Sequence, residues 1–381
     1  MVKRISILGS TGSIGVNTLK IASQLKDEID VVYLSCNKNA SLLIEQAIAF
    51  NVEAVCIVDN NYLSVVQNAL DCYNIEVLNG RDGLLELAER NNVDILLNGL
   101  VGASGMEPTL RAIQSGIDVA LSNKESLVMA GKIITTAMEI SKAKLFPVDS
   151  EHSAIWQCLV GEDIEDVRRL IITGSGGPFL RRDIQTFSDI TVQEALNHPN
   201  WDMGNKISID SATMMNKGFE VIEAFWLFGF TSEFIDIIIH PQSIIHSMIE
   251  FKDASIKAQL GIPDMKIPIQ YALTYPRHLD TPWEKLDFFS CQDLTFEEPN
   301  FKRFPCMRLA FDSLDRDGTA SAVLNLSNDY AVARFLNNEI RFTDIPLINE
   351  SSMNNHEWVE NPTLDDLKSL DDWVENHVSS Y

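Results

Sequence analysis

The sequence has few cysteines, and none of them stands in an arrangement typical of a disulfide framework or a zinc site. Its six cysteines are scattered, with no CxxC pair and no neighbouring histidine at zinc-ligand spacing. Such isolated cysteines are usually buried free thiols. We therefore expect neither disulfides nor a zinc centre.

Positive charge is also scarce. The chain has 30 Lys and Arg against 54 Asp and Glu, a formal net charge of -24. A surface of this sign repels nucleic acid and anionic lipid, so no nucleic-acid partner is expected. An anionic substrate would need a specific pocket of local donors.

Long apolar runs are missing as well. The start, MVKRISILG, has only a brief apolar run before Gly9, too short for the core of a signal peptide, and no later stretch approaches a membrane span. We expect a cytoplasmic protein without a membrane partner.

Residues 1–150 alternate short apolar segments with helical patterns, which is typical of a doubly wound α/β sheet. We therefore predict an N-terminal Rossmann-type domain. The apolar segments expected to form strands are Ile5 to Leu8, Val31 to Leu34, Ala54 to Val58, Ile95 to Asn98, Val119 to Leu121 and Leu145 to Val148.

The remaining chain has a different texture. Residues 151–275 combine a Gly-rich turn, a helix and β-rich segments, and predict a separate α+β domain. Its acidic helix and Gly-rich turn, described below, make it the expected catalytic domain for the metal and the substrate. The proline-containing stretch 276–304 suits a surface connector, and 305–381 predict a C-terminal helical bundle. Thr343 and Thr363 are the expected N-caps, with Asp366 completing a capping-box-like pattern.

A glycine-rich turn follows the first expected strand. Gly9, Gly12 and Gly15 in ISILGSTGSIG stand between an apolar strand and the helical pattern NTLKIASQL. Glycines there permit a tight turn and let backbone N–H groups approach a pyrophosphate. An ordinary Gly-rich turn is the alternative, but the position at the start of a βαβ series favours dinucleotide binding.

The second expected strand ends without the carboxylate that NAD-preferring sites usually carry. VVYLSCNKN places Lys38 and Asn39 there, and a cation with amides suits the extra 2′-phosphate of NADP. A solvated surface lysine is the alternative for Lys38.

Two acidic residues follow the last strand of this series. If KLFPVDSEH stays extended, Asp149 and Glu151 lie on one face, because side chains alternate along a strand. Two convergent carboxylates favour Mg²⁺ or Mn²⁺ over zinc. A solvated pair at a strand end is the alternative.

A third ligand candidate comes from MMNKGFEVIEAFWLFG. Asn216, Glu220 and Glu223 form one polar stripe on a helix that is otherwise apolar all round. A structural salt bridge with Lys217 is possible, but one lysine against two glutamates leaves charge for a metal to neutralise.

Two further segments suggest substrate contacts. Ser175 in TGSGGP resembles part of an anion-cradling turn. The long polar stretch 179–204 ends in HPNWDMG and predicts an active-site lid with little apolar packing of its own, closed by Trp201 and His198. We interpret His240, His246 and His278 as structural.

Several long motifs, in this order, closely resemble the 1-deoxy-D-xylulose 5-phosphate reductoisomerase family. They are GSTGSIG, SNKESLVMAG, PVDSEHSAIWQ, TGSGGPF, HPNWDMG, ISIDSATMMNKG, IIHPQSIIHSMI and GIPDMKIPIQYA. The sequence departs from the family's usual pattern at Asn37, Leu180 and LNLSND. The resemblance implies an NADP-dependent oxidoreductase that rearranges and reduces a small phosphorylated sugar with NADPH and Mn²⁺ or Mg²⁺, and that works as a homodimer.

The resemblance also implies site residues. Lys124, Glu151 and His198 are the implied catalytic residues, and Asp149, Glu151 and Glu220 the implied metal ligands. Ser150, Lys124 and Glu151 would meet the keto and hydroxyl end of the substrate, and Glu220 is a further implied substrate contact. The phosphate end would be held by Ser175, His198, Ser211, Asn216 and Lys217. The cofactor contacts would be Thr11, Gly12, Ser13, Ile14, Lys38, Asn39, Asn123, Glu125, Gly204 and Met265.

Two other functions are considered. A different NADP-dependent oxidoreductase, such as a semialdehyde dehydrogenase, would need a catalytic cysteine, and no cysteine stands in a suitable motif. A non-catalytic dinucleotide sensor would keep the glycines but has no need for the carboxylates, the helix stripe and the lid together.

Overall fold

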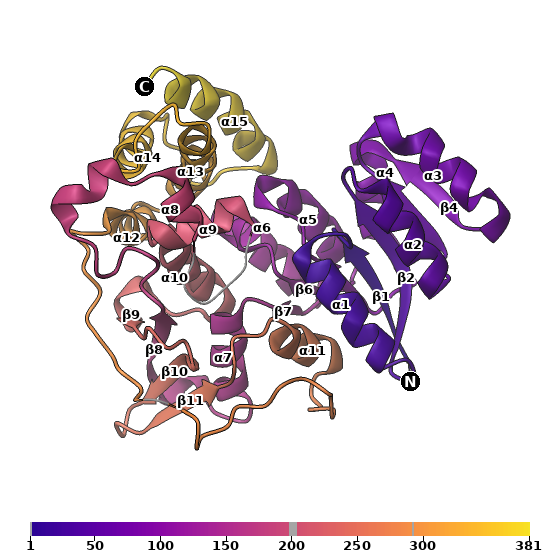
Figure 1. The fold of residues 1–381 in the computed structure, drawn as a ribbon, viewed down its shortest axis with the longest axis horizontal. Helices are drawn as coiled ribbons and strands as arrows, with labels where there is room; N and C mark the ends of the chain where they lie inside the picture. Colours follow the sequence, from indigo (N-terminus) through magenta and orange to yellow (C-terminus); the bar gives the residue numbers. More distant parts are fainter. Residues whose placement is uncertain (1, 198–203, 292) are drawn as a thin grey trace. The chain divides into compact units, whose positions relative to one another are not determined.

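The chain folds into two compact units in the computed structural model, which describes residues 2–197, 204–291 and 293–381. Unit 1 comprises residues 1–126, 132–153 and 264–283, and unit 2 comprises 127–131, 154–263 and 284–381. Figure 1 shows the elements of both units along the chain. Each unit is described by itself.

Unit 1 is built on a seven-stranded parallel sheet with the order β4-β3-β2-β1-β5-β6-β7. Its central strands are largely buried, and Ala54–Ile57 and Ile95–Asn98 are buried along their whole length, as in parallel sheets that are covered on both faces. This sheet confirms the Rossmann-type prediction. Its strands are β1 (Lys3–Leu8), β2 (Ile29–Cys36), β3 (Ala54–Ile57), β4 (Glu76–Asn79), β5 (Ile95–Asn98), β6 (Asp118–Leu121) and β7 (Leu145–Pro147).

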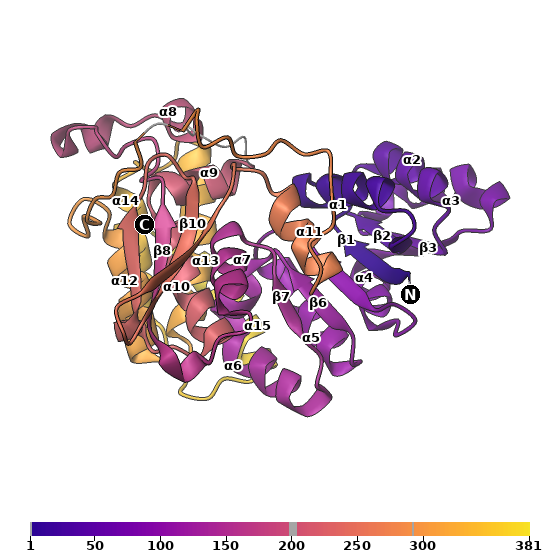
Figure 2. The ribbon, with the colours of Figure 1, turned by 90° about the horizontal axis from the view of Figure 1, so that it is seen from below.

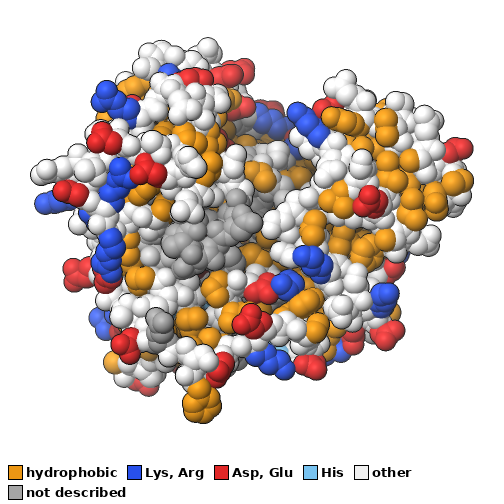
Figure 3. Space-filling view, viewed as in Figure 1, with side chains coloured by type: hydrophobic (Ala, Val, Ile, Leu, Met, Phe, Trp, Pro, Cys, Tyr) orange, Lys and Arg blue, Asp and Glu red, His pale blue; other side chains and the backbone are white. Residues whose placement is uncertain are grey.

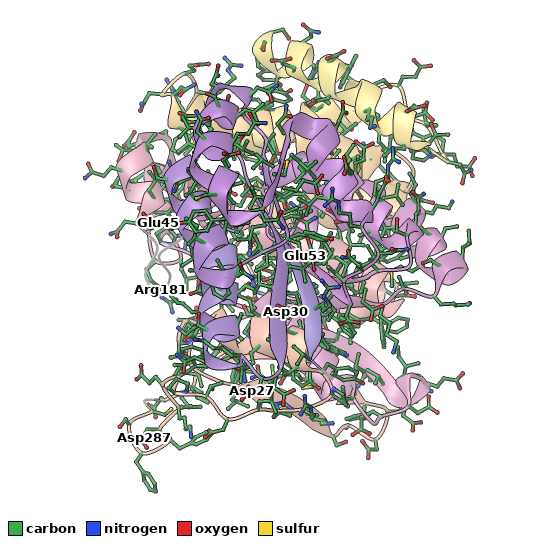
Figure 4. All side chains as sticks on the ribbon, turned by 90° about the vertical axis from the view of Figure 1, so that its right-hand side faces the viewer. Asp27, Asp30, Glu45, Glu53, Arg181 and Asp287 are labelled. Carbon is green, nitrogen blue, oxygen red and sulfur yellow. The ribbon has the colours of Figure 1, made fainter. Side chains whose placement is uncertain are left out.

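Helices of unit 1 alternate with these strands. They are α1 (Ser13–Gln24), α2 (Ala40–Phe50), α3 (Leu63–Leu70), α4 (Gly80–Glu89), α5 (Met106–Gln114), most of α6 (Lys124–Ser141) and α11 (Lys266–Thr274). Helix α7 (Ser150–Leu159) begins in unit 1 and ends in unit 2. Near the N-terminal end of β1, the central strand of the sheet, Arg4 forms ion pairs with Asp30 and Glu53, both labelled in Figure 4.

Unit 2 contains a four-stranded sheet with the order β11-β10-β8-β9. Strand β8 (Val167–Gly174) runs parallel to β9 (Ile235–Ile239) and antiparallel to β10 (Ile245–Phe251), which pairs in turn with β11 (Ile256–Leu260). Helix α10 (Met215–Phe228) packs on β8 and β9, as Figure 2 shows. The other helices of this unit are α8 (Val192–Leu196), α9 (Asn205–Ala212), α12 (Pro305–Arg316), α13 (Ala320–Leu336), α14 (Asp344–Asn355) and α15 (Leu364–Ser379).

The C-terminal helices share their core with α10. Phe219 and Ile222 of α10 belong to one buried cluster with Leu309 of α12, Leu324 of α13 and Met353 of α14. The predicted helices are therefore present, but they form one unit with the four-stranded sheet instead of a separate domain. The predicted capping box at Thr363 and Asp366 is present, whereas the Thr343 side chain forms no cap hydrogen bond.

Two further differences concern the middle of the chain. The segment Asp264–Trp283 belongs to unit 1 and contains α11, although we predicted residues up to 275 as part of the catalytic domain and 276–304 as a connector. In addition, residues 179–197 of the expected lid are packed: Phe179, Phe187, Ile190 and Ala195 are buried. The expectation of little apolar packing is therefore wrong for this part of the stretch.

Charged side chains are interspersed on the surface. Figure 3 shows Lys and Arg scattered among Asp and Glu on the face turned to the viewer, without a large basic patch. Among the described residues, no helix has the length and apolar character that crossing a membrane requires.

Candidate functional site

The Gly-rich turn between β1 and α1 is possible only with glycine. Gly9 has φ +82°, and a Cβ atom there would lie 2.9 Å from the carbonyl oxygen of Gly99. A Cβ atom on Gly15 would lie 2.4 Å from the carbonyl oxygen of Gly9 and from the Cα of Ser10. The strand and the helix are thus packed as closely as a dinucleotide-binding turn requires.

The N-terminus of α1 is open to an anion. Its N-cap is Gly12, which supplies no side-chain hydrogen bond, and its first turn has no acidic residue. Gly12 and Ser13 are exposed, and Thr11 and Ile14 are half-buried. The backbone N–H groups and the positive end of the helix dipole therefore suit a pyrophosphate, as the sequence predicted.

The end of β2 presents the expected polar residues. Asn37, Lys38 and Asn39 are all exposed just beyond the strand. The Asn39 side chain accepts a hydrogen bond from the backbone N–H of Leu42, so this residue also caps α2.

Asn123 and Glu125 lie at the N-terminus of α6 and are buried. The Asn123 side chain accepts from the backbone N–H of Ser126 and donates to the carbonyl oxygens of Leu100 and Gly102. It also donates to Glu125 Oε2 at 3.1 Å. Asn123 therefore fastens the loop after β5 to the start of α6.

An ion pair joins Lys124 to Asp149. The Lys124 Nζ atom lies 2.5 Å from Asp149 Oδ2, and the two side chains are 8% and 14% exposed. Burial alone disfavours the charged carboxylate, but the Lys124 ammonium and the His152 ring lower the pKa of Asp149 well below its usual range. Asp149 is therefore a carboxylate at neutral pH.

The extended conformation predicted for residues 149–151 is wrong. Strand β7 ends at Pro147, and Ser150 is the first residue of α7. Asp149 accepts from the backbone N–H of Ser150 at 2.9 Å, and the Ser150 hydroxyl donates to Glu151 Oε2. An acidic residue is favourable in the first turn of a helix, which gives a physical reason for the early helix start.

His152 is a residue of this site that we did not predict. Its side chain is fully buried, and its Nδ1 lies 3.7 Å from Asp149 Oδ2. The sequence signal is the spacing of three residues between Asp149 and His152, which places both on one face of a helix but not of a strand. Because we predicted a strand here, this pair was missed.

Helix α10 in unit 2 carries the predicted polar stripe. Glu220 and Glu223 are both fully buried. The Asn216 side chain donates to Glu220 Oε1, and Lys217 Nζ donates to Glu220 Oε2. The structural salt bridge considered from the sequence is therefore present, and it leaves Glu223 as a second buried carboxylate one turn further along.

The end of β8 and the turn after it contact helices α10 and α9. Lys217 Nζ donates to the carbonyl oxygen of Thr173 at 2.9 Å. A Cβ atom on Gly177 would lie 2.6 Å from the carbonyl oxygen of Ser211 at the end of α9. Within unit 2 the structure thus brings together the elements that carry Ser175, Ser211, Asn216 and Lys217.

The other predicted residues lie in both units. Gly204 is the exposed N-cap of α9 in unit 2, and Met265 is the half-buried N-cap of α11 in unit 1. His198 and Trp201 lie outside the described residues. His240 is structural as expected, since its ring contacts the carbonyl oxygen of Thr295 and accepts from the backbone N–H of Ile244.

Comparisons with known proteins identify the family of the chain. Family models described as 1-deoxy-D-xylulose 5-phosphate reductoisomerase match residues 5–131, and models of its C-terminal domains match 145–228 and 260–377. The 1-deoxy-D-xylulose 5-phosphate reductoisomerase of Chloroherpeton thalassium is 48% identical over 377 residues, which cover 99% of this chain and 97% of the relative. The enzyme of that name from Ruminiclostridium cellulolyticum is 48% identical over 374 residues, covering 98% of each chain. The chain belongs to the 1-deoxy-D-xylulose 5-phosphate reductoisomerase family.

Solved structures of reductoisomerases have the same fold. The enzyme from Zymomonas mobilis in complex with NADPH is 40% identical and has a TM-score of 0.94, with coverage of 100% of this chain and 99% of that chain. A reductoisomerase in complex with NADPH, fosmidomycin and magnesium is 37% identical, also with a TM-score of 0.94, and covers 100% and 98%. The predicted family and fold class are confirmed, and the expected cofactors, NADPH and a divalent metal, are those found in these relatives.

The close packing of the Gly-rich turn leads to a testable expectation. Gly15→Ala should weaken NADPH binding by about 10-fold or more, because the added methyl group displaces the turn and with it the N–H groups at the start of α1. A fluorescence titration with NADPH measures this. Lys20→Ala, at an exposed position of the same helix, is the matched control and should bind normally. Unchanged affinity of the Gly15 variant would show that the turn does not bind the cofactor.

Proposed function

We propose that this chain catalyses the NADPH- and divalent-metal-dependent rearrangement and reduction of 1-deoxy-D-xylulose 5-phosphate to 2-C-methyl-D-erythritol 4-phosphate, in the non-mevalonate isoprenoid pathway. The observation that carries this proposal is family membership along nearly the whole chain. The dinucleotide turn, the Lys124–Asp149 pair and the polar stripe of α10 are all in place. These features support the assignment of a cofactor site and of catalytic groups for the proposed reaction.

Asp149, Glu151 and Glu220 are the proposed metal ligands. All three offer carboxylate oxygens, which Mg²⁺ and Mn²⁺ prefer. Asp149 carries a lowered pKa and so remains ionised, and Glu220 is a fully buried carboxylate that already receives two donors. A carboxylate that accepts a hydrogen bond on each oxygen is held in one orientation, which suits a ligand of a divalent cation.

NADPH is proposed to bind with its pyrophosphate at Thr11, Gly12, Ser13 and Ile14, and with its 2′-phosphate near Lys38 and Asn39. The exposed Lys38 supplies a cation at the end of β2, where a carboxylate would repel that phosphate. Asn123 and Glu125, at the start of α6, are proposed as further cofactor contacts. Gly204 and Met265 are assigned to the nicotinamide side.

The substrate is proposed to contact residues from two parts of the chain. Ser150, Glu151 and Lys124 are assigned to its keto and hydroxyl end, together with Glu220. Its phosphate is assigned to Ser175, Ser211, Asn216 and Lys217, with His198. Buried Lys217 supplies positive charge to this group, and hydroxyl and amide side chains supply further donors.

In the proposed mechanism the chain's own residues bind and orient the substrate and polarise its oxygens. Lys124 is a catalytic residue because an ammonium carries three N–H donors, so it can donate to Asp149 and to a substrate oxygen that gains negative charge. Glu151, the second catalytic carboxylate, is held by the Ser150 hydroxyl. A bound divalent cation supplies Lewis-acid polarisation of the substrate's carbonyl, and NADPH supplies the hydride.

Four of the six cysteines are disfavoured as the nucleophile of a thiol-dependent dehydrogenase. Burial raises the pKa of Cys36 and Cys158 to about 11 and that of Cys56 and Cys306 to about 12. A thiol needs a lowered pKa to act as a nucleophile. These four cysteines are therefore inert structural groups.

An NADPH oxidation assay with 1-deoxy-D-xylulose 5-phosphate tests the proposed reaction. We expect turnover with Mg²⁺ or Mn²⁺, loss of turnover in EDTA, and recovery when the metal is restored. NADH should be a much poorer cofactor, with a kcat/KM lower by about 10-fold or more, because it lacks the 2′-phosphate that Lys38 is proposed to bind. Activity that persists without metal, or equal efficiency with NADH, would contradict the corresponding assignment.

Removing single ligand charges tests the metal site. Asp149→Asn, Glu151→Gln and Glu220→Gln should each lower turnover by about 100-fold or more and weaken Mn²⁺ binding, while the affinity for NADPH stays the same. Glu223→Gln is the matched control, because Glu223 is equally buried on the same helix but is not an assigned ligand. If Glu223→Gln inactivates the enzyme and Glu220→Gln does not, the helix ligand is misassigned.

We also propose a cytoplasmic homodimer. Phe288 and Phe289 are consecutive and 66% and 103% exposed, and contiguous exposed apolar side chains are a feature of interaction surfaces. Light scattering should give twice the chain mass of 42.7 kDa. Phe289→Ser should shift the protein toward monomer, and a monomeric parent protein would refute the proposal.

A further inference from the structure

Helix α9 connects the assigned phosphate site to the C-terminal helices. Ser211 lies in the last turn of α9, and its carbonyl oxygen packs directly against the backbone at Gly177 in the turn after β8. The residue before it, Asp210, is buried and 2% exposed. A displacement of Asp210 therefore moves Ser211 against a turn that has no spare room.

Asp210 belongs to a polar network that reaches α13. Its Oδ1 accepts from the Asn328 side chain at 2.7 Å, and its Oδ2 lies 3.0 Å from Lys206 Nζ. Lys206 also lies 3.0 Å from Asp329 Oδ1. Two residues of α9 are thus fastened to two consecutive residues of α13.

The network continues into α14 without reaching solvent. The Asn349 amide donates to Asn328 Oδ1 at 3.2 Å, and the Ser327 hydroxyl donates to Asn349 Oδ1 at 3.1 Å. Asn328, Asn349 and Ser327 are all fully buried. The amide of Asn328 is therefore held in one orientation, with its donor aimed at Asp210.

Such a network adds little to the free energy of unfolding, but it fixes the position of one helix on another. Burying a carboxylate and an ammonium costs desolvation that their attraction only partly offsets, and apolar residues of similar volume are often as stable. Apolar contacts, however, are not directional, so they allow a helix to shift along or around its axis. Hydrogen bonds at fixed geometry prevent this shift.

We propose that Asp210, Lys206 and Asn328 are positioning residues for substrate binding, which fix α9 on α13 so that Ser211 meets the substrate phosphate. This inference rests on the proposed function, in which Ser211 binds that phosphate. None of the three touches the reacting atoms in this assignment. They act through Ser211, and a misplacement of about 1 Å at a binding group is enough to cost up to 100-fold in rate.

A double-mutant cycle between Asn328 and Ser211 tests the inference. Asn328→Leu keeps the side-chain volume but removes the donor to Asp210. We expect it to raise the KM for the sugar phosphate about 10-fold and to leave the KM for NADPH within about 2-fold. In a Ser211→Ala background the same substitution should change the KM for the sugar phosphate less than about 2-fold, because the group it positions is already gone.

Two further variants separate positioning from general stability. Val332→Ala removes a buried contact elsewhere on α13, so it should lower the melting temperature without raising the KM for the sugar phosphate. Lys206→Met, at a side chain that is 19% exposed, should reproduce the KM effect if Asn328→Leu does not fold.

The outcomes distinguish this inference from the proposed function. Equal effects of Asn328→Leu with and without the Ser211 hydroxyl, or an unchanged KM for the sugar phosphate, would overturn the positioning role while the reaction stands. A Ser211→Ala enzyme with a normal KM would overturn the phosphate assignment of Ser211 and this inference together. A parent protein that does not turn over the sugar phosphate would refute the function itself.

Discussion

The ion pair between Lys217 and Glu220 is the interaction on which the catalytic region depends. Most of helix α10 is buried, and it carries Glu220 at a position with no exposure. Lys217 compensates that charge and also donates to the carbonyl oxygen of Thr173 at the end of β8. One ammonium therefore fixes the helix, the strand end and the buried carboxylate relative to one another.

The glycines around this lysine follow from the same constraint. A Cβ atom on Gly174 would lie 3.0 Å from the Lys217 side chain, and one on Gly177 would meet the backbone of α9. The turn can pass this close only because both residues lack a side chain. The Gly-rich segment that resembles an anion cradle in the sequence is thus also a packing requirement of the buried lysine.

Much of unit 1 could be predicted because its signals are local. Apolar segments of three to five residues predicted six of its seven strands, but β4 was missed because Glu76 and Asn79 at its ends are exposed and polar. The sequence around Asp149 was ambiguous in a physical sense: Asp-Ser-Glu after a strand fits both a continued strand and the first turn of a helix. In the structure this segment starts helix α7, which brings the His152 ring close to the Asp149 carboxylate.

Contacts between segments that are far apart in the sequence could not be predicted from local sequence patterns. Asn328 and Asp210 are 118 positions apart, and nothing in either local pattern indicates the other. The C-terminal helices were predicted as a bundle, but α13 is buried along most of its length, and an all-round buried helix does not reveal which partner it packs on. The family motifs supplied the chemical assignments that periodicity left open.

The late segment Asp264–Trp283 has a consequence for how the protein is made. Its helix α11 packs on α1, and Arg277 pairs with Glu28 across 249 positions of the chain. When residue 153 is synthesised, unit 1 still lacks this piece, and at about 5–20 residues per second another roughly 7–26 s pass before residue 283 is synthesised. During that interval the surface of α1 that α11 later covers stays open to solvent. The dinucleotide-binding unit is thus the first to begin folding on the ribosome, but its last contacts form only after most of the catalytic region has been translated.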